Sequence, residues 1–448
     1  MAILPIDSGR YGTARMLAIF DEQRRVDYQV RIEGAVAGAQ GTLGIIPSDA
    51  AEKITKKAVS GSITTERIAE LEAKSDHDTA SLVEALAELC PDNARPWIHY
   101  GLTSNDLVDT STSMQMRDAL FIIIPKAIRL AQSLIHMAET HSKLPAVGRT
   151  HGQHASIISF GLKFANWAEE IAVHVERLRN MVRRVCVCKT LGVVGTGSLM
   201  GDKALMVQAK VAKMLDLNPI MVATQIVPRE RYAEYIFSLT LLGSTLDKIA
   251  LEIRNLQRTE INEVAEQFKQ GQMGSSAVPI KRNPIKSERI SSLAKLLRGQ
   301  VGIAFENIAL WHERDLTNSA NERFTIPTTS ILLDEMCESM LRVISNIVIN
   351  RDRIIKNIDM TKGHIFAEFV MGALIQKGMS RMTAYRAVQG VAFEALKMDV
   401  HLRDALMQDS AISQNLSKND LNAIFNPAMQ LGASLAIIRN VSEHVKGL

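Results

Sequence analysis

Apolar side chains recur at helical spacing over long stretches of the chain. Between residues 233 and 256 they follow one another at steps of three and four: Ile236, Leu239, Leu242, Leu246, Ile249, Ile253 and Leu256. This spacing places them on one stripe of a helix and predicts the seam of a helical bundle. Phe237, Leu241 and Leu251 add apolar surface outside the stripe, so we expect contacts on more than one side.

The same pattern runs through three further segments, 158–182, 288–313 and 330–349. Helices of this length exceed the usual globular range of about 8 to 20 residues, which favours a bundle of long helices. Apolar faces beyond a single stripe also favour an oligomer.

Polar, turn-rich segments divide the chain. Residues 89–106 close an N-terminal helical region, and residues 349–363 open a C-terminal one that continues with short helices over 367–378 and 380–397. We therefore predict an all-α fold with three helical domains: an N-terminal domain at 1–106, a long-helix bundle at 107–350 and a C-terminal domain at 351–448.

The composition agrees with a helical protein and argues against a nucleic-acid-binding or membrane protein. Of the 448 residues, 46% are apolar and only 5% aromatic. The net charge of +4 is small for this length, so we expect no nucleic-acid partner and infer a local anion site instead. No uninterrupted apolar run approaches the roughly 20 residues of a membrane helix, so we expect no membrane partner.

The cysteines and the first residues indicate a cytoplasmic protein. Cys90, Cys186, Cys188 and Cys337 are too few and too scattered for a disulfide framework or a zinc finger, and free thiols in a reducing compartment fit them better. The N-terminal segment has no cationic start followed by an apolar run, so we do not expect a signal peptide.

Four short segments carry polar residues that a bundle does not need. In the first, 99–106, His99, Thr103 and Ser104 stand at a turn before a helix. Ser104 or Asn105 would serve there as an ordinary N-cap, and the same helix N-terminus with hydroxyls beside it would also bind a carboxylate or phosphate.

The second segment, 148–155, reads Gly-Arg-Thr-His-Gly-Gln-His-Ala. His151 and His154 lack a third metal ligand in the sequence, so a metal site is not expected. A histidine after such a turn suits proton transfer near neutral pH, although a structural histidine is equally compatible with the sequence.

The third segment, "GQMGSSAVPIKRNPIKSER" at 271–289, combines glycines, prolines, hydroxyls and cations and predicts a loop. Such a loop would close over an anion, with a serine acting as base if its hydroxyl pKa were lowered, and with Lys281 and Asn283 holding a carboxylate. A solvated linker is the alternative.

In the fourth segment, Arg314, Ser319 and Arg323 recur at steps of five and four. They would converge on one oxyanion if a helix or turn brought them together, and arginine suits phosphate because its guanidinium is bidentate. The alternative is a solvated charged face. Up to this point the residues indicate an anion-binding helical protein without choosing a reaction.

The motifs themselves resemble a known family. "GSSAVPIKRNP" is similar to the signature loop of the fumarase and aspartase superfamily, and its extension "KRNPIKSER" resembles the adenylosuccinate lyase branch. "RYGTARM", "HYGLTSNDLVDT", "GRTHGQHA" and "ERDLTNSANER" resemble segments of that branch in the same order, so the likeness spans nearly the whole chain.

The resemblance implies a homotetramer with active sites shared between subunits and small-molecule nucleotide substrates. It implies β-elimination of fumarate from adenylosuccinate, giving AMP, and from the succinylated aminoimidazole carboxamide ribotide SAICAR, giving AICAR, in purine nucleotide biosynthesis. No metal or organic cofactor is expected.

The resemblance also implies residue roles. Ser275, rather than Ser276, matches the general base, His151 the general acid, and Glu288 the carboxylate that orients His151. The other matching positions are two further active-site histidines, His77 and His99; the succinyl-binding residues Thr103, Ser104, Thr150, Lys281 and Asn283; the phosphate-binding residues Arg10, Tyr11, Arg314, Ser319 and Arg323; and Gln225 near the substrate.

Two positions depart from the family pattern: Val278 replaces a methionine of the loop, and Asp76 precedes His77 where threonine or arginine is usual. Three alternatives remain open. A carboxymuconate cycloisomerase shares the loop but has no nucleotide phosphate to bind. An argininosuccinate lyase or aspartase fits the "KRNPIKSER" extension less well, and a non-catalytic helical scaffold would not need Ser275, His151, Lys281 and Glu288 together.

Overall fold

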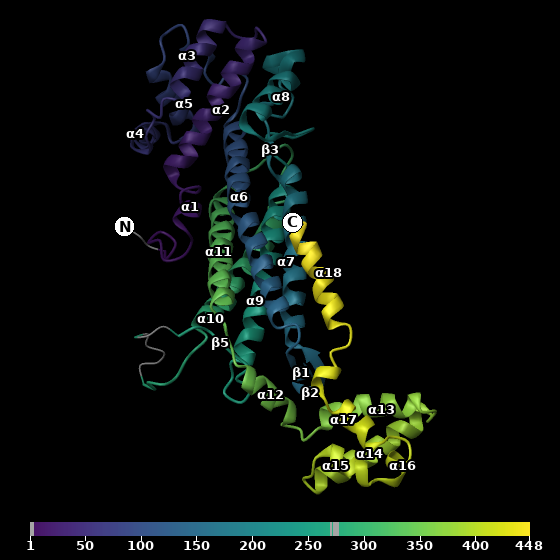
Figure 1. Ribbon diagram of the computed structural model, residues 1–448. Coiled ribbons are helices and arrows are strands. Elements are labelled where there is room, and N and C mark those ends of the chain that lie inside the picture. Colours follow the sequence, from purple (N-terminus) through teal and green to yellow (C-terminus); the bar gives the residue numbers. More distant parts are fainter. Residues whose placement is uncertain (1–3, 269–270, 272–276) are drawn as a thin grey trace. The chain divides into compact units, whose positions relative to one another are not determined.

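The computed structural model describes residues 4–268, 271 and 277–448, and its regular structure is almost entirely helical (Figure 1). This confirms the all-α fold class predicted from the spacing of apolar residues. The chain forms two compact units. Unit 1 comprises Met1–Ala127, His174–Leu246 and Ser292–Glu338, and unit 2 comprises Ile128–Val173, Asp247–Ser291 and Ser339–Leu448. The division into three domains at residues 106 and 350 stays a prediction.

Five long helices contain residues of both units: α6 (Ser104–Thr140), α7 (Phe160–Val185), α9 (Glu230–Leu256), α10 (Ile285–Glu306) and α11 (Ser319–Ser345). The predicted seam of α9 is confirmed, because every one of its seven side chains from Ile236 to Leu256 is at most 2% exposed. Phe237 and Leu251, outside the stripe, are 42% and 49% exposed in the single chain.

One described helix, α6, is long and apolar enough to cross a membrane, although 56% of its most apolar stretch is buried inside the protein. The sequence shows no uninterrupted apolar run there because Lys126 and Arg129 fall within the apolar stretch. Lys126 is itself buried and donates to Asp334 of α11 at 2.5 Å, so this part of α6 packs as a core helix.

Within unit 1, the N-terminal helices pack around α2 (Figure 1). Gly34 and Gly41 allow α3 to approach α2 closely, since a Cβ at either glycine would lie 2.6 or 2.4 Å from the Cβ of Ala58 or Ala51. The remaining elements of this unit are α1 (Ala14–Leu17), α2 (Glu22–Thr42), α3 (Ser48–Ala58), α4 (Thr65–Ser75), α5 (Asp78–Leu89), η1 (Arg95–Trp97), β3 (Val187–Cys188), η2 (Ser198–Lys203), α8 (Ala204–Leu215) and β4 (Asn218–Pro219), with β3 and β4 pairing in parallel.

Within unit 2, short helices near the C-terminus enclose their own apolar cluster, which includes Val370, Leu374, Leu402 and Leu406. The elements are β1 (Pro145–Thr150), β2 (Gln153–Ser159), β5 (Val264–Ala265), β6 (Val348–Ile349), α12 (Arg351–Asp359), η3 (His364–Phe366), α13 (Ala367–Gln376), α14 (Arg381–Lys397), α15 (Leu402–Gln408), α16 (Ser410–Ser413), α17 (Lys418–Ile424), η4 (Pro427–Met429) and α18 (Ser434–Lys446). β1 and β2 form an antiparallel hairpin, and β5 pairs with β6.

The predicted loop at 271–289 is shorter in the structure, because α10 begins at Ile285, directly after Pro284. Glu266 stabilises this helix start: its carboxylate accepts hydrogen bonds from the backbone amide and the hydroxyl of Ser287, both at 2.7 Å, and from the amide of Lys286 at 3.2 Å. A carboxylate at a helix N-terminus accepts hydrogen bonds from backbone amides that have no partner within the helix. Its negative charge also interacts favourably with the positive end of the helix dipole. A local reading of the sequence cannot find this cap, which comes from 21 residues earlier in the chain.

Candidate active site

Unit 1 contains a cavity of about 750 Å³, formed by α2, the α4–α5 turn, α6, the segment before α9 and the start of α11. Six of the expected site residues line it: His77, Ser104, Gln225, Arg314, Ser319 and Arg323. These positions are spread over almost 250 residues of sequence, so the fold rather than local spacing brings them together.

His77 reaches the cavity wall as the N-cap of α5. Its Nδ1 accepts a hydrogen bond from the amide of Ala80 at 3.2 Å, and the preceding Asp76 turns the chain with a left-handed φ of 54°. Since Nδ1 is the acceptor, the neutral ring carries its proton on Nε2. The side chain is 54% exposed, which leaves the ring accessible to a ligand.

The start of α6 is fixed by a buried carboxylate. Asp106 accepts from the amide of Thr103 at 2.8 Å and pairs with the ammonium group of Lys189 at 2.6 Å, and both charged side chains are fully buried. The helix therefore starts at Ser104, and its first residue lines the cavity. Neither Ser104 nor Asn105 is the N-cap, because both already belong to the helix.

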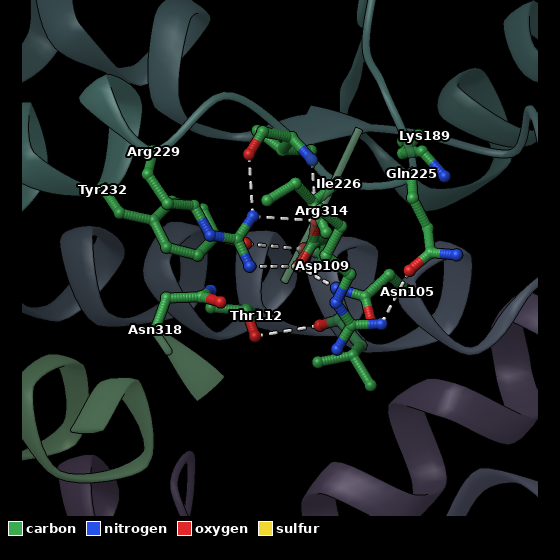
Figure 2. Close-up of polar contacts among 12 residues, drawn as sticks. Asn105, Asp109, Thr112, Lys189, Gln225, Ile226, Arg229, Tyr232, Arg314 and Asn318 are labelled. Atoms are coloured by element: carbon green, nitrogen blue, oxygen red, sulfur yellow. Dashed lines mark hydrogen bonds and ion pairs between the residues drawn. The ribbon is translucent and has the colours of Figure 1, made fainter. Parts of the chain in front are cut away.

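Arg314 and Gln225 form one edge of the cavity, with the Arg314 Nη1 donating to Gln225 Oε1 at 2.9 Å (Figure 2). The Nε of Arg314 is buried and has no hydrogen-bond partner. Burial lowers the pKa of the Arg314 guanidinium, opposed by the charge of Asp109, and the group nevertheless stays cationic at neutral pH. A partly desolvated cation with an unused donor favours an anionic ligand.

The start of α11 forms another wall. Ser319 is the first residue of this helix, and Arg323 lies one turn further along it. The Arg323 side chain is 62% exposed, and its Nη2 lies 3.2 Å from Asp78 Oδ2. A helix N-terminus with a hydroxyl and an arginine beside it has the donors that an oxyanion requires.

A buried ionic network connects these walls, and the sequence analysis missed it (Figure 2). Arg229 donates to both oxygens of Asp109 at 2.9 Å and also to Glu322 at 2.9 and 3.1 Å. Its guanidinium lies 4.6 Å from the ring centre of Tyr232. The sequence around Asp109 gives no clear signal of the network, because the residues three and four positions away on the same helix face, Asn105, Asp106, Thr112 and Ser113, are also polar.

Four expected site residues of unit 1 do not line this cavity: Arg10, Tyr11, His99 and Thr103. His99 has a left-handed φ of 60° and its Nδ1 lies 2.6 Å from the carboxylate of buried Glu33. Burial lowers the pKa of His99, but the hydrogen bond and charge of Glu33, with the charge of Asp106, outweigh it and raise the pKa above 6.5. The N-terminal segment is held to α11 through Thr13, whose hydroxyl donates to Asp334 at 2.6 Å.

Thr150 and His151 lie in unit 2, at the tip of the β1–β2 hairpin. His151 and Gly152 form its two-residue loop and both have positive φ, 52° and 75°. Two positive φ values define the tight hairpin turn that matches strand twist, and a histidine in that region is strained. The turn holds the exposed His151 at the outermost point of the hairpin. The sequence predicts a turn here but gives no sign of the hairpin.

The remaining expected residues of unit 2 surround the start of α10. Lys281 and Asn283 precede the helix, and Glu288 is an exposed side chain of its first turn. Ser275 and Ser276 lie outside the described residues. Within the described part of the chain, no three His, Cys, Asp or Glu side chains gather to hold a metal ion, and the expected absence of a cofactor stays a prediction.

Comparisons with known proteins identify the class. A family model described as "Lyase" matches residues 9–299. Among solved structures, the fold is similar to fumarate lyase from Mesorhizobium sp. BNC1 (TM-score 0.89, 28% identity, 98% of both chains) and to 3-carboxy-cis,cis-muconate lactonizing enzyme from Pseudomonas putida (TM-score 0.89, 27% identity, 99% of both chains). Fold and site together define a lyase of the fumarase and aspartase superfamily.

Sequence relatives narrow the class to one family. A second model, described as "Adenylosuccinate lyase C-terminus", matches residues 363–441. The chain is 43% identical to the adenylosuccinate lyase of Methanothermobacter thermautotrophicus, over 99% of both chains, and 39% identical to that of Methanocaldococcus jannaschii, over 100% of this chain and 96% of the relative. The chain belongs to the adenylosuccinate lyase family.

Proposed function

We propose that the protein catalyses β-elimination of fumarate from adenylosuccinate, giving AMP, and from SAICAR, giving AICAR, in purine nucleotide biosynthesis. The observation that carries this proposal is the cavity of unit 1, where Arg314, Ser319 and Arg323 gather around a space large enough for a ligand. Full-length similarity to adenylosuccinate lyases supports the same reaction.

The elimination requires a base, an acid and an anion clamp. Ser275 takes the proton from the carbon beside a carboxylate of the succinyl group, the electron pair becomes the double bond of fumarate, and the carbon–nitrogen bond breaks. The carboxylate gains negative charge as the proton leaves, so cationic and amide donors at Lys281 and Asn283 stabilise the transition state.

The leaving nitrogen takes a proton from His151, which is therefore the general acid. The exposed position of His151 at the hairpin tip supports this role, because the ring is free to meet a ligand. Glu288 orients the ring, in the way that a carboxylate holds the histidine of a catalytic triad. Thr103, Ser104 and Thr150 complete the succinyl site.

The phosphate end of the nucleotide is held by Arg314, Ser319 and Arg323, with Arg10 and Tyr11 from the N-terminal segment. His77, His99 and Gln225 complete the active site around the substrate. The hydrogen bond between Arg314 and Gln225 supports the proposal that these two residues bind the substrate together.

We further propose a homotetramer with active sites shared between subunits. One observation supports it. Large apolar side chains are exposed along the long helices of the single chain: Phe237, Leu251, Leu296, Ile303, Phe305 and Phe324.

A cytoplasmic location remains part of the proposal. All four cysteines are free and buried, as expected for a protein that folds in a reducing compartment. We expect catalysis without a metal or an organic cofactor, because acid–base groups and fixed donors suffice for the elimination.

The second candidate is a carboxymuconate cycloisomerase, which the similarity to the Pseudomonas putida enzyme favours. Fumarate release from adenylosuccinate, with 3-carboxy-cis,cis-muconate as the parallel substrate, separates the two. We expect fumarate from adenylosuccinate and no conversion of the muconate. Conversion of the muconate alone would establish the cycloisomerase, and no reaction with either substrate would favour a non-catalytic scaffold.

A further inference from the structure

Arg25 of α2 lines the cavity of unit 1, and neither the sequence motifs nor the comparisons give it a role. Its Nη1 lies 3.9 Å from Asp78 Oδ2, and the Nη2 of Arg323 lies 3.2 Å from the same oxygen. Two guanidinium groups from helices far apart in the sequence therefore face one anionic oxygen atom.

The donors of Arg25 are not all used. Glu22 accepts from its Nη2 at 2.5 Å, but the Nε is buried and has no hydrogen-bond partner. A buried donor without a partner is uncommon in proteins and requires an explanation. The side chain is only 25% exposed, so water does not fully solvate it.

Arg229, which also lines the cavity, differs from Arg25 in its partners. Arg229 is saturated by Asp109 and Glu322, and it holds the wall rather than facing a ligand. Arg25 and Arg323, by contrast, both face Asp78, and Arg25 also pairs with Glu22. The Asp78 oxygen therefore lies near the guanidinium groups of both arginines. An anionic ligand that binds at the same place could accept hydrogen bonds from Arg25 and from Arg323.

We propose that Arg25 binds the phosphate monoester of the nucleotide substrate together with Arg323, and that Asp78 holds both guanidinium groups in place while no ligand is bound. This inference rests on the proposed function. It extends the phosphate site from α11 to α2. A phosphate monoester carries about 1.5 to 2 negative charges at neutral pH, which a second arginine helps to balance.

The test compares Arg25→Gln with Arg24→Gln. Arg24 is the neighbouring exposed arginine, which lies over the ring of Tyr28, 5.3 Å from its centre, and does not line the cavity. The measurements are KM and kcat for adenylosuccinate, together with calorimetric Kd values for AMP, adenosine and fumarate. Arg25→Lys is the conservative variant, and circular dichroism verifies that each variant folds.

For Arg25→Gln we expect KM and the Kd of AMP to rise about tenfold, which corresponds to about 1.4 kcal/mol. We expect kcat to stay within about threefold and the Kd values of adenosine and fumarate to stay unchanged, because neither molecule carries a phosphate. Arg25→Lys should fall between wild type and Arg25→Gln, since lysine keeps the charge without the bidentate geometry. Arg24→Gln should match wild type.

An unchanged Kd of AMP in Arg25→Gln would overturn the inference, and so would a loss of fumarate binding with AMP binding intact, which would assign Arg25 to a carboxylate. If wild type binds AMP through Arg25 but releases no fumarate from adenylosuccinate, the proposed reaction is wrong and the phosphate contact stands. If wild type does not bind AMP, the phosphate contact is wrong as well.

Discussion

Arg229 and Asp109 face each other through two parallel hydrogen bonds of 2.9 Å, with side chains that are 2% and 1% exposed. Asp109 also accepts from the amide of Val227 at 2.7 Å, and Glu322 accepts from the other side of the guanidinium. The pair thereby joins α6, the segment before α9 and the start of α11. These three elements carry Ser104, Gln225 and Ser319 to the cavity.

Replacing Arg229 with Met should lower the free energy of unfolding by about 3 to 5 kcal/mol, because it leaves the buried carboxylate of Asp109 and the partly buried carboxylate of Glu322 without their cation. Urea denaturation measures the change. The matched control is Arg258→Met, since Arg258 is 61% exposed and its nearest carboxylate oxygen, on Glu260, lies 3.6 Å away. We expect the control to lose less than about 1 kcal/mol. If both variants lost the same free energy of unfolding, the ionic network around Arg229 would not be important for stability.

His151→Asn should reduce kcat about 10²- to 10⁴-fold while the protein stays folded. Asparagine tolerates the positive φ of the hairpin tip, so the turn is kept and only the acid is removed. Steady-state fumarate release measures kcat, and a thermal melt verifies folding. His154→Asn on the same hairpin is the control and should keep turnover near that of wild type. Near wild-type turnover in His151→Asn would exclude the acid role.

Ser275→Ala should abolish turnover, whereas Ser276→Ala should retain most of it. Both serines lie outside the described residues, so this prediction depends on the motif alone. Alanine has no hydroxyl group, so it cannot remove the proton from carbon. Single-turnover fumarate release by the two variants, measured side by side, gives the answer. If Ser276→Ala lost more turnover than Ser275→Ala, Ser276 rather than Ser275 would be the general base.

Arg323→Met should raise KM for adenylosuccinate about 10- to 100-fold with little change in kcat, because a phosphate contact remote from the reacting bond contributes equally to the ground state and the transition state. Initial rates over a range of substrate concentrations measure both constants. Arg386→Met, at an exposed position of α14, is the control. A selective loss of kcat at saturating substrate would argue against the phosphate role.

The pair of His99 and Glu33 should make stability depend on pH. The pKa of His99 is raised in the folded protein, so its stabilising contribution is fully present below the ordinary value of 6.5 and is lost as pH rises through the raised value. Glu33→Gln should therefore destabilise the protein more at about pH 5.5 than at about pH 8.5. Urea denaturation at both pH values measures this. An equal or larger effect at the higher pH would contradict the raised pKa.

The sequence predicted those parts of the fold that depend on local periodicity. The seam of α9 is visible in the spacing of its apolar residues, and each residue of that stripe is buried. The helix ends at Leu256, the last residue of the stripe, and Val264–Ala265 then pairs with Val348–Ile349. A strand pairing between residues so far apart leaves no signal in either segment alone.

The sequence by itself determined the all-α class, the family and most of the residues proposed for the site, because helical periodicity and short motifs are local properties of the chain. Only the tertiary structure decided which of these residues share a cavity, and that Arg25 and the pair of Arg229 and Asp109 belong to its walls. Asp109 and Arg229 are 120 residues apart, and Asp78 and Arg323 are 245 apart. Contacts over such separations arise from the packing of long helices, which no stretch of sequence encodes alone.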